Sequence, residues 1–359
     1  MVSRHRAQFT WSLLAVAFLS ATLIFDRGAA LAANSMTVVD PSGRDPAMVQ
    51  DADGNPVIAY VDGSNGGLRV VHCEQQSCAS SRFEFSEPDS RFDVLSPAIA
   101  LDSAGNPVIA YDSFNGFLTV LHCNDPDCAS NDEFPVYPQS TLFDGFSPAR
   151  GDLRVAVDGL FPVIAWENVR DGDGDVYFMH CSTADCSGFQ TVQLLEPGAC
   201  FGHSPALALS ANNNPVLAFN SCNGTFNFWR CDDPSCSGTD FKTQIPLGAG
   251  AAGIDLVLDG SGNPVFAFEQ ALALAILRCN DQQCAGNDET LNTPDDAGQN
   301  GFKPSLRLVA NKPVVAYLRL DTSADVVKLL RCNDVACAPG GDTVTAPDSA
   351  PSVGRVTLG

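Results

Sequence analysis

The stretch SPAIALDSAGNPVIAYDSFNGFLTVLHCNDPDCAS, residues 96–130, recurs along the chain and decides its fold. Related copies begin near residues 46, 152, 204, 253 and 303, so the chain holds six copies in all. The first cysteines of successive copies are 50, 58, 50, 48 and 53 residues apart. A period near 50 residues, built from short apolar runs, is typical of the blades of a β-propeller.

Each copy contains short apolar runs separated by turn signals. In the copy at 96–130, the runs 98–101, 107–111 and 118–122 read as strands, and a more variable fourth strand is expected near 134–137. Asp and Asn in the D-S-A-G-N turn bond to their own backbone, and Gly accepts a positive φ. No run shows the apolar period of a helix. We therefore predict an all-β chain, a β-propeller of six four-stranded antiparallel blades.

The closure of the ring leaves alternatives. Residues 36–40 resemble the outermost strand of a blade, and residues 351–358 resemble an innermost strand. Two spare strands do not make a seventh blade, so we expect six blades with one spare segment paired at the seam. A seven-bladed ring needs two more strands from elsewhere, and an open solenoid of blades is a third arrangement.

The first residues predict the compartment. Arg4 and Arg6 precede an apolar run at 11–25, and Ala30-Leu31-Ala32 provides a small-x-small cleavage site. This is the pattern of a secretory signal peptide, here residues 1–33, ahead of a propeller domain at residues 36–359. The alternative is an uncleaved anchor, but the run is shorter than the roughly 20 residues that span a bilayer. We expect a secreted protein, extracellular or periplasmic, with no membrane span after cleavage.

The charge of the chain excludes one class of partner. The sequence has 42 acidic and 20 basic residues, a formal charge of −22. Loss of the leader removes three arginines and one aspartate, a net +2, which takes the charge to −24. Nucleic-acid binding requires a basic face, so no nucleic-acid partner is expected.

The cysteines predict a set of disulfides. Every copy carries a C-x4-C pair, and a seventh bridge is expected across the fourth blade. A lone pair lacks the four ligands of structural zinc, and an exported chain with an even cysteine count favours disulfides over metal. The predicted pairs are Cys73–Cys78, Cys123–Cys128, Cys181–Cys186, Cys231–Cys236, Cys279–Cys284, Cys332–Cys337 and Cys200–Cys222.

Candidate ligand-binding residues lie on two parts of the disc. The loops that connect the second strand to the third, and one blade to the next, vary between copies, and variable loops on a rigid scaffold usually carry function. On the innermost strands, charges replace the small residues of other copies and are expected either to face the central channel or to form ion pairs between blades. The candidates are Asp112, Glu167, His203 and Glu269 on the loop face, and Arg154, Asp255 and Arg307 on the innermost strands.

Two patterns raise the question of a metal. Asp171, Asp173 and Asp175 alternate as calcium ligands do, but the residues that would complete an EF-hand are absent, and a solvated hairpin tip is the alternative. We expect no cofactor, and calcium at these aspartates is the alternative. His72, His122 and His180 precede the first cysteine in three copies, whereas the other copies have Arg there, so we expect hydrogen-bonded strand residues.

No HExxH, GxSxG or P-loop pattern occurs. The recurring D-x-x-G-N-P-V-x-A-Y, followed by C-x4-C, resembles the repeats of secreted bacterial β-propeller proteins of uncharacterised type. The chain is only distantly similar to six-bladed sialidases, because their S-x-D-x-G-x-T-W boxes are missing, and no sialidase residues are carried over. We predict a monomeric, non-catalytic binding scaffold for an extracellular protein or glycan. The alternative is a propeller-type carbohydrate hydrolase, such as a glycosidase.

Overall fold

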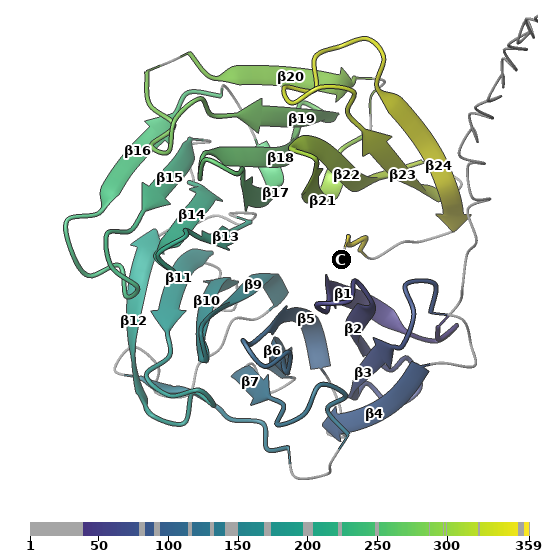
Figure 1. Cartoon of the computed structure of the whole chain (residues 1–359), viewed down its shortest axis with the longest axis vertical. Helices are drawn as coiled ribbons and strands as arrows, with labels where there is room; N and C mark the ends of the chain where they lie inside the picture. The colour runs from purple at the N-terminus through teal and green to yellow at the C-terminus, as the bar shows by residue number, and fades with distance from the viewer. Residues whose placement is uncertain are drawn as a thin grey trace, which may run out of the picture. The chain divides into compact units, whose positions relative to one another are not determined.

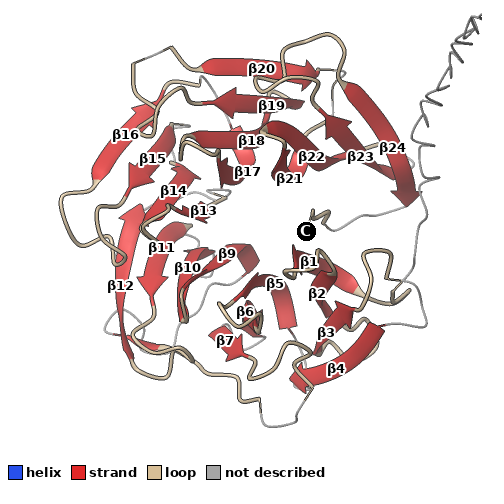
Figure 2. Cartoon of the chain, in the orientation of Figure 1, coloured by secondary structure: helices blue, strands red, loops and turns tan. Residues whose placement is uncertain are grey.

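The computed structural model describes most of the chain after its first residues. The described residues are 39–78, 83–89, 94–113, 117–129, 133–140, 150–168, 174–196, 204–221, 225–247, 251–286, 288–296, 298, 300–321, 324–350 and 355–358. The chain divides into Met1–Met36 and Thr37–Gly359, and all the structure below belongs to the second unit. Within the described ranges the fold consists of strands and loops, as Figure 2 shows. No helix there is long and apolar enough to cross a bilayer.

The fold is a six-bladed β-propeller of antiparallel sheets, as the repeats predicted. The strands of blades 1 to 3 are β1 (Arg44–Gln50), β2 (Pro56–Val61), β3 (Leu68–Cys73), β4 (Phe83–Asp89); β5 (Val94–Leu101), β6 (Pro107–Ser113), β7 (Leu118–His122); and β9 (Arg150–Asp158), β10 (Phe161–Asn168), β11 (Asp175–His180), β12 (Phe189–Glu196). Blades 4 to 6 contain β13 (Ala206–Leu209), β14 (Pro215–Asn220), β15 (Phe226–Arg230), β16 (Phe241–Ile245); β17 (Ala251–Leu258), β18 (Pro264–Gln270), β19 (Ala273–Arg278), β20 (Thr290–Asp295); and β21 (Phe302–Val309), β22 (Lys312–Arg319), β23 (Asp325–Arg331), β24 (Thr343–Ala350).

Blade 2 departs from the regular pattern at its outer edge. The strand expected at 134–137 is a single antiparallel bridge between Val120 and Val136 in the described residues. The short β8 (Gln139–Ser140) then pairs in parallel with β12 of the next blade. The chain thus crosses from blade 2 to the rim of blade 3 before it enters β9.

Apolar side chains hold neighbouring blades together. Each of five buried clusters contains residues of two successive blades, which joins blades 1–2, 2–3, 3–4, 4–5 and 5–6. At the junction of blades 4 and 5, the Phe226 ring lies edge-on to the Phe266 ring with centroids 5.1 Å apart. The first strand of each blade lies towards the centre of the ring and the last lies at the rim (Figure 1). Because apolar side chains fill the space between successive sheets, several small cores between blades replace one large core.

The six predicted C-x4-C disulfides are present. In every pair the second cysteine has a left-handed backbone, with φ between 45° and 56°. Each bridge therefore fixes a tight turn at the end of the third strand. The predicted Cys200–Cys222 bridge lies outside the described residues.

The histidines before the first cysteines are hydrogen-bonded, as predicted. His72 places Nε2 at 3.0 Å from Asp51 of its own blade and Nδ1 at 2.7 Å from Asp127, which lies in the cysteine loop of blade 2. Arg278, at the same position of blade 5, contacts Asp259 of its own blade at 2.6 Å and donates to the Val335 carbonyl in the cysteine loop of blade 6. This position, His in blades 1 to 3 and Arg in blades 4 to 6, thus links blade 1 to blade 2 and blade 5 to blade 6.

The seam between blades 6 and 1 differs from the expectation of a paired spare strand. In the described parts of the two spare segments, residues 39–40 and 355–358, there is no strand. Within the described residues, the sheets of blades 6 and 1 each contain only their own four consecutive strands, and no strand is exchanged across the seam there. Instead, residues 355–358 lie in the middle of the ring (Figure 1). Leu358 N–H donates to Ser305 Oγ at 2.9 Å, and Arg355 donates to the Pro97 carbonyl at 3.2 Å.

Candidate functional site

The strand register aligns equivalent positions around the centre of the ring. In every blade one residue of the first strand pairs with the alanine of the P-V-x-A motif on the second strand. These six positions are Ala47, Ala98, Arg154, Ala206, Asp255 and Ser305. Arg307 lies two residues further along β21, opposite Val314. The alignment inferred from the sequence is therefore correct, and two blades carry a charge where three others carry alanine.

A second set of equivalent positions lies two residues earlier, where the chain enters the first strand. These residues are Asp45, Ser96, Asp152, Ser204, Gly253 and Lys303, and all but Asp152 have φ between 43° and 59°. In four of these blades the register between the first two strands also shifts here. Such bulges re-aim side chains and are frequent beside functional sites, and a left-handed backbone strains residues other than glycine.

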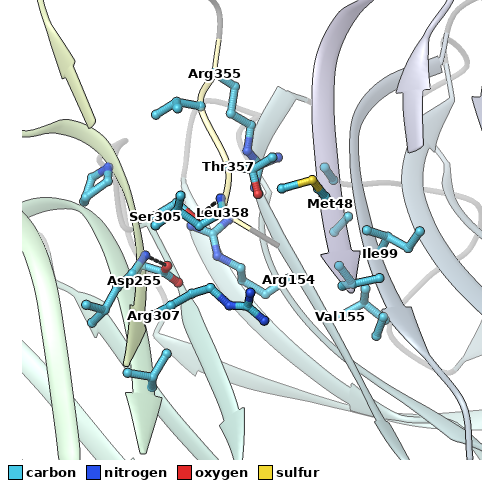
Figure 3. A pocket seen from close by; sticks show the side chains of 18 of the residues that line it. Met48, Ile99, Arg154, Val155, Asp255, Ser305, Arg307, Arg355, Thr357 and Leu358 are labelled. Carbon is cyan, nitrogen blue, oxygen red and sulfur yellow. Dashed lines mark hydrogen bonds between the residues drawn. The ribbon is translucent and has the colours of Figure 1, made fainter. Parts of the chain in front are cut away.

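A cavity of 680 Å³ lies between the first strands of all six blades and residues 355–358. Its volume falls within the roughly 300–1,000 Å³ usual for small-molecule sites. The charged residues that line it are Asp45, Asp152, Arg154, Asp255, Lys303, Arg307 and Arg355. Four cations thus face three acids, an excess of positive charge inside a chain of net charge −22. Met48, Ile99 and Val155 provide an apolar wall on another side (Figure 3).

The predicted strand charges do not form ion pairs between blades in the described structure. Arg154 and Asp255 bond to the backbone of other blades, and Arg307 bonds to the side chain of Gln50. Arg154 of blade 3 donates to the Ile254 carbonyl of blade 5 at 3.2 Å. Asp255 of blade 5 accepts the Leu306 N–H of blade 6 at 2.7 Å. Both residues line the central cavity. The sequence had left open whether they face the central channel or form ion pairs between blades.

The two carboxyls near Arg154 have pKa values shifted in opposite directions. Burial raises the pKa of Asp255, and the nearby Arg154 only partly offsets that effect. Burial also opposes ionisation of Asp152, but Arg154 and Arg355 outweigh it and lower the pKa of this carboxyl. Environments that separate the pKa values of two acids are a feature of acid–base sites as well as of charge networks.

The predicted loop-face acids are more enclosed than the sequence suggested. Asp112 and Glu167 are 4% and 3% exposed at the ends of β6 and β10. Glu269 is partly buried and accepts the Leu272 N–H at 2.9 Å, which caps the β18–β19 turn. His203 lies outside the described residues. The structure brings Arg154, Asp255 and Arg307 to one cavity, while Asp112, Glu167 and Glu269 do not line it.

The proposed calcium ligands are only partly described. Asp171 and Asp173 fall outside the described ranges, and Asp175 at the start of β11 accepts the Tyr177 hydroxyl at 3.0 Å. Calcium binding by this hairpin stays a prediction, which metal analysis of the purified protein would test.

Sequence reasoning missed four charged residues of the cavity: Asp45, Asp152, Lys303 and Arg355. A signal for three of them was present, because they occupy the first position of their repeat copies, and Asp45 and Lys303 precede proline as Ser96 and Ser204 do. Arg355 gave no such signal, since its segment resembled a strand and not a cavity lining.

Comparison with known proteins supports the fold. No family model matches the chain, and no curated protein matches its sequence. A lectin of Aleuria aurantia in complex with Fucα1-6GlcNAc superposes with a TM-score of 0.54 at 9% identity, over 86% of this chain and 96% of the lectin. AofleA from Arthrobotrys oligospora gives 0.53 at 7% identity, over 88% and 91%. The GH93 α-L-arabinofuranosidase of Fusarium graminearum, solved with arabinobiose, gives 0.50 at 14% identity, over 86% and 92%.

These similarities establish the class of fold. At such identities they show a six-bladed β-propeller and no shared activity. A lectin and a glycosidase both occur among the similar structures, so the fold alone does not distinguish binding from hydrolysis.

Proposed function

We propose that this protein is a secreted, non-catalytic binding scaffold that holds a glycan in the central cavity. The observation that carries the proposal is the pair Arg154 and Asp255. These partly buried charges occupy a position where blades 1, 2 and 4 have alanine. A repeat scaffold does not need charges at a buried, symmetric position for stability.

The surroundings of these two residues suit a sugar. Ser96 and Ser305 add hydroxyls to the lining, the charged groups add donors and acceptors, and Met48 and Ile99 add an apolar surface. Small-ligand sites typically combine apolar walls with a few placed polar groups. The lectin of Aleuria aurantia, which has a similar fold and was solved with Fucα1-6GlcNAc, is consistent with glycan binding.

Secretion and a monomeric state belong to the same proposal. The six described disulfides suggest an oxidising compartment, which agrees with the predicted leader at residues 1–33. Secretion is tested by expression with the native leader and N-terminal sequencing of the exported protein. The monomeric state is tested by measuring the mass of that protein in solution.

Binding is tested on a glycan array with the purified mature protein. Arg154→Gln and Arg307→Gln should each abolish the signal for any glycan bound by the wild type. Arg331→Gln is the matched control, because Arg331 lies exposed on β23 and does not line the cavity. An array on which no glycan binds, or on which all three variants bind equally, contradicts the proposed site.

Carbohydrate hydrolysis is the second candidate, and the opposite pKa shifts of Asp152 and Asp255 favour it. Glycosidases usually employ two carboxyls, one protonated as the acid and one ionised as base or nucleophile. The mature protein is incubated with a panel of glycosides, beside Asp152→Asn and Asp255→Asn. Turnover that both substitutions abolish would establish the enzyme and remove the non-catalytic proposal. Binding without turnover would leave the scaffold.

A further inference from the structure

Three guanidinium groups at the cavity donate hydrogen bonds to neutral oxygens in the described structure. Arg154 donates to the carbonyls of Leu153 and Ile254 at 3.0 and 3.2 Å. Arg307 donates to the Gln50 side-chain oxygen at 2.7 Å, and Arg355 donates to the Pro97 carbonyl. None of the three arginines belongs to an ion pair within the described residues.

The same three groups are partly removed from water. Each arginine is partly buried, and burial lowers the pKa of Arg307 and of Arg355. Arg154 lowers the pKa of Arg355 further, because two like charges lie near each other, and the carboxylates of Asp152, Asp255 and Asp45 offset only part of the two effects. Partly buried cations that are not in direct ion pairs cost free energy, and they are retained most readily where an anion binds.

The arginines reach the cavity from three separate parts of the chain. Arg154 comes from β9 of blade 3, Arg307 from β21 of blade 6, and Arg355 from the segment that crosses the middle of the ring (Figure 3). The segment is fixed at its other end by the bond from Leu358 to Ser305. Three segments that are distant in the sequence thus place their guanidinium groups at the same cavity.

We propose that the cavity binds an acidic saccharide and that the guanidinium groups of Arg154, Arg307 and Arg355 hold its carboxylate. A guanidinium offers paired N–H donors that match the two oxygens of a carboxylate, which also neutralises the excess positive charge. This inference rests on the proposed glycan-binding function and names the class of glycan. The acidic surface of the chain repels such a ligand elsewhere, so binding concentrates at the cavity.

The test uses uronic-acid tetrasaccharides of several linkages, each beside its methyl ester, with the mature protein in a calorimeter. The ester keeps the size and hydroxyls of the sugar and removes its charge. At least one acid should bind ten-fold or more tightly than its ester, and added salt should weaken that binding. Arg355→Gln and Arg307→Gln should each reduce the acid-to-ester ratio towards one. Arg331→Gln should leave the ratio unchanged.

The outcomes separate this inference from the proposed function. Equal affinity for acid and ester, or binding of neutral sugars alone, overturns the carboxylate site and leaves glycan binding in place. No affinity for any acidic or neutral saccharide overturns both. A further probe is a tetrasaccharide that carries sulfate groups and no carboxylate. If it binds and no uronic-acid tetrasaccharide does, the carboxylate assignment is also overturned. Melting temperatures of all variants are measured first, so that a loss of binding is read only for folded protein.

Discussion

Arg154 of blade 3 reaches past blade 4 and donates a hydrogen bond to the backbone carbonyl of Ile254 in blade 5, at 3.2 Å. Arg154 therefore lines the cavity and also connects blades 3 and 5, which share no apolar cluster in the described residues. The same guanidinium lowers the pKa of Asp152. Arg154 therefore organises both the shape and the charge of the central site.

Replacement of Arg154 should show both roles. We expect Arg154→Gln to reduce the free energy of unfolding by about 1–3 kcal/mol, the usual range for lost charged hydrogen bonds. The pKa of Asp152 should rise, since its strongest favourable partner is removed. Chemical denaturation measures the first effect and an NMR titration of the carboxyl measures the second. An unchanged pKa for Asp152 would refute the electrostatic link.

The link between blades 1 and 2 should depend on pH. Burial opposes protonation of His72, but the carboxylates of Asp51 and Asp127 outweigh it and raise its pKa above 6.5. Its stabilisation is therefore complete below that value and is lost as pH rises through the raised pKa. Burial opposes ionisation of Asp51, but bonds from His72 and Asn55 lower its pKa below 3.8, so its contribution is lost only in acid.

The pH window follows from these directions. The difference in melting temperature between wild type and His72→Gln should be largest between about pH 4 and 6.5 and should shrink in alkali. Differential scanning calorimetry from pH 4 to 9 measures it. In an Asp51→Asn background the same substitution should show a weaker pH dependence. A constant difference across the range would mean that the link is not ionic.

The aromatic contact between blades 4 and 5 should dominate local stability. Phe266 is fully buried and packs edge-on against Phe226 and Phe228. Phe266→Ala should cost about 3–5 kcal/mol, because it removes buried apolar surface and leaves a cavity. Phe134→Ala is the matched control, since Phe134 is 75% exposed, and it should change stability by less than about 0.5 kcal/mol. Similar costs for both would contradict the described packing.

Each C-x4-C disulfide should stabilise the protein only locally. The bridge from Cys123 to Cys128 closes a loop with a sequence separation of only 5, for which the chain-entropy model gives about 2 kcal/mol. Cys123→Ser with Cys128→Ser should lower stability by about that amount and leave the ring folded. Far- and near-ultraviolet circular dichroism would report the fold, and denaturation the cost. Complete unfolding of the double variant would show that this disulfide is required for the fold of the whole propeller.

The sequence predicts the repeat architecture because blades that pack against neighbours in the same way carry the same pattern of apolar and turn residues. The P-V-x-A strand, the turn before it and the C-x4-C pair recur for local reasons, so blade number, strand order and six disulfides follow from them. The charged positions Arg154 and Asp255 stand out because other copies have alanine there.

The rest depends on contacts between distant residues. Arg355 enters the cavity through bonds with Pro97 and, by way of Leu358, with Ser305, which no local pattern encodes. Asp112 and Glu167 are buried at the ends of β6 and β10, whereas the sequence placed them on an open loop face. In the described residues the outer edge of blade 2 is one bridge, and the chain then pairs with β12 of blade 3 through β8, a contact that no local pattern encodes.

The central claim is that the cavity between the six first strands binds a saccharide. A crystal structure of the mature protein with its best-binding tetrasaccharide tests this most directly. The account predicts a sugar carboxylate within hydrogen-bonding distance of Arg154, Arg307 or Arg355, and sugar rings against the wall formed by Met48 and Ile99. A saccharide bound on the face of the cysteine loops, with the cavity unchanged, would contradict it.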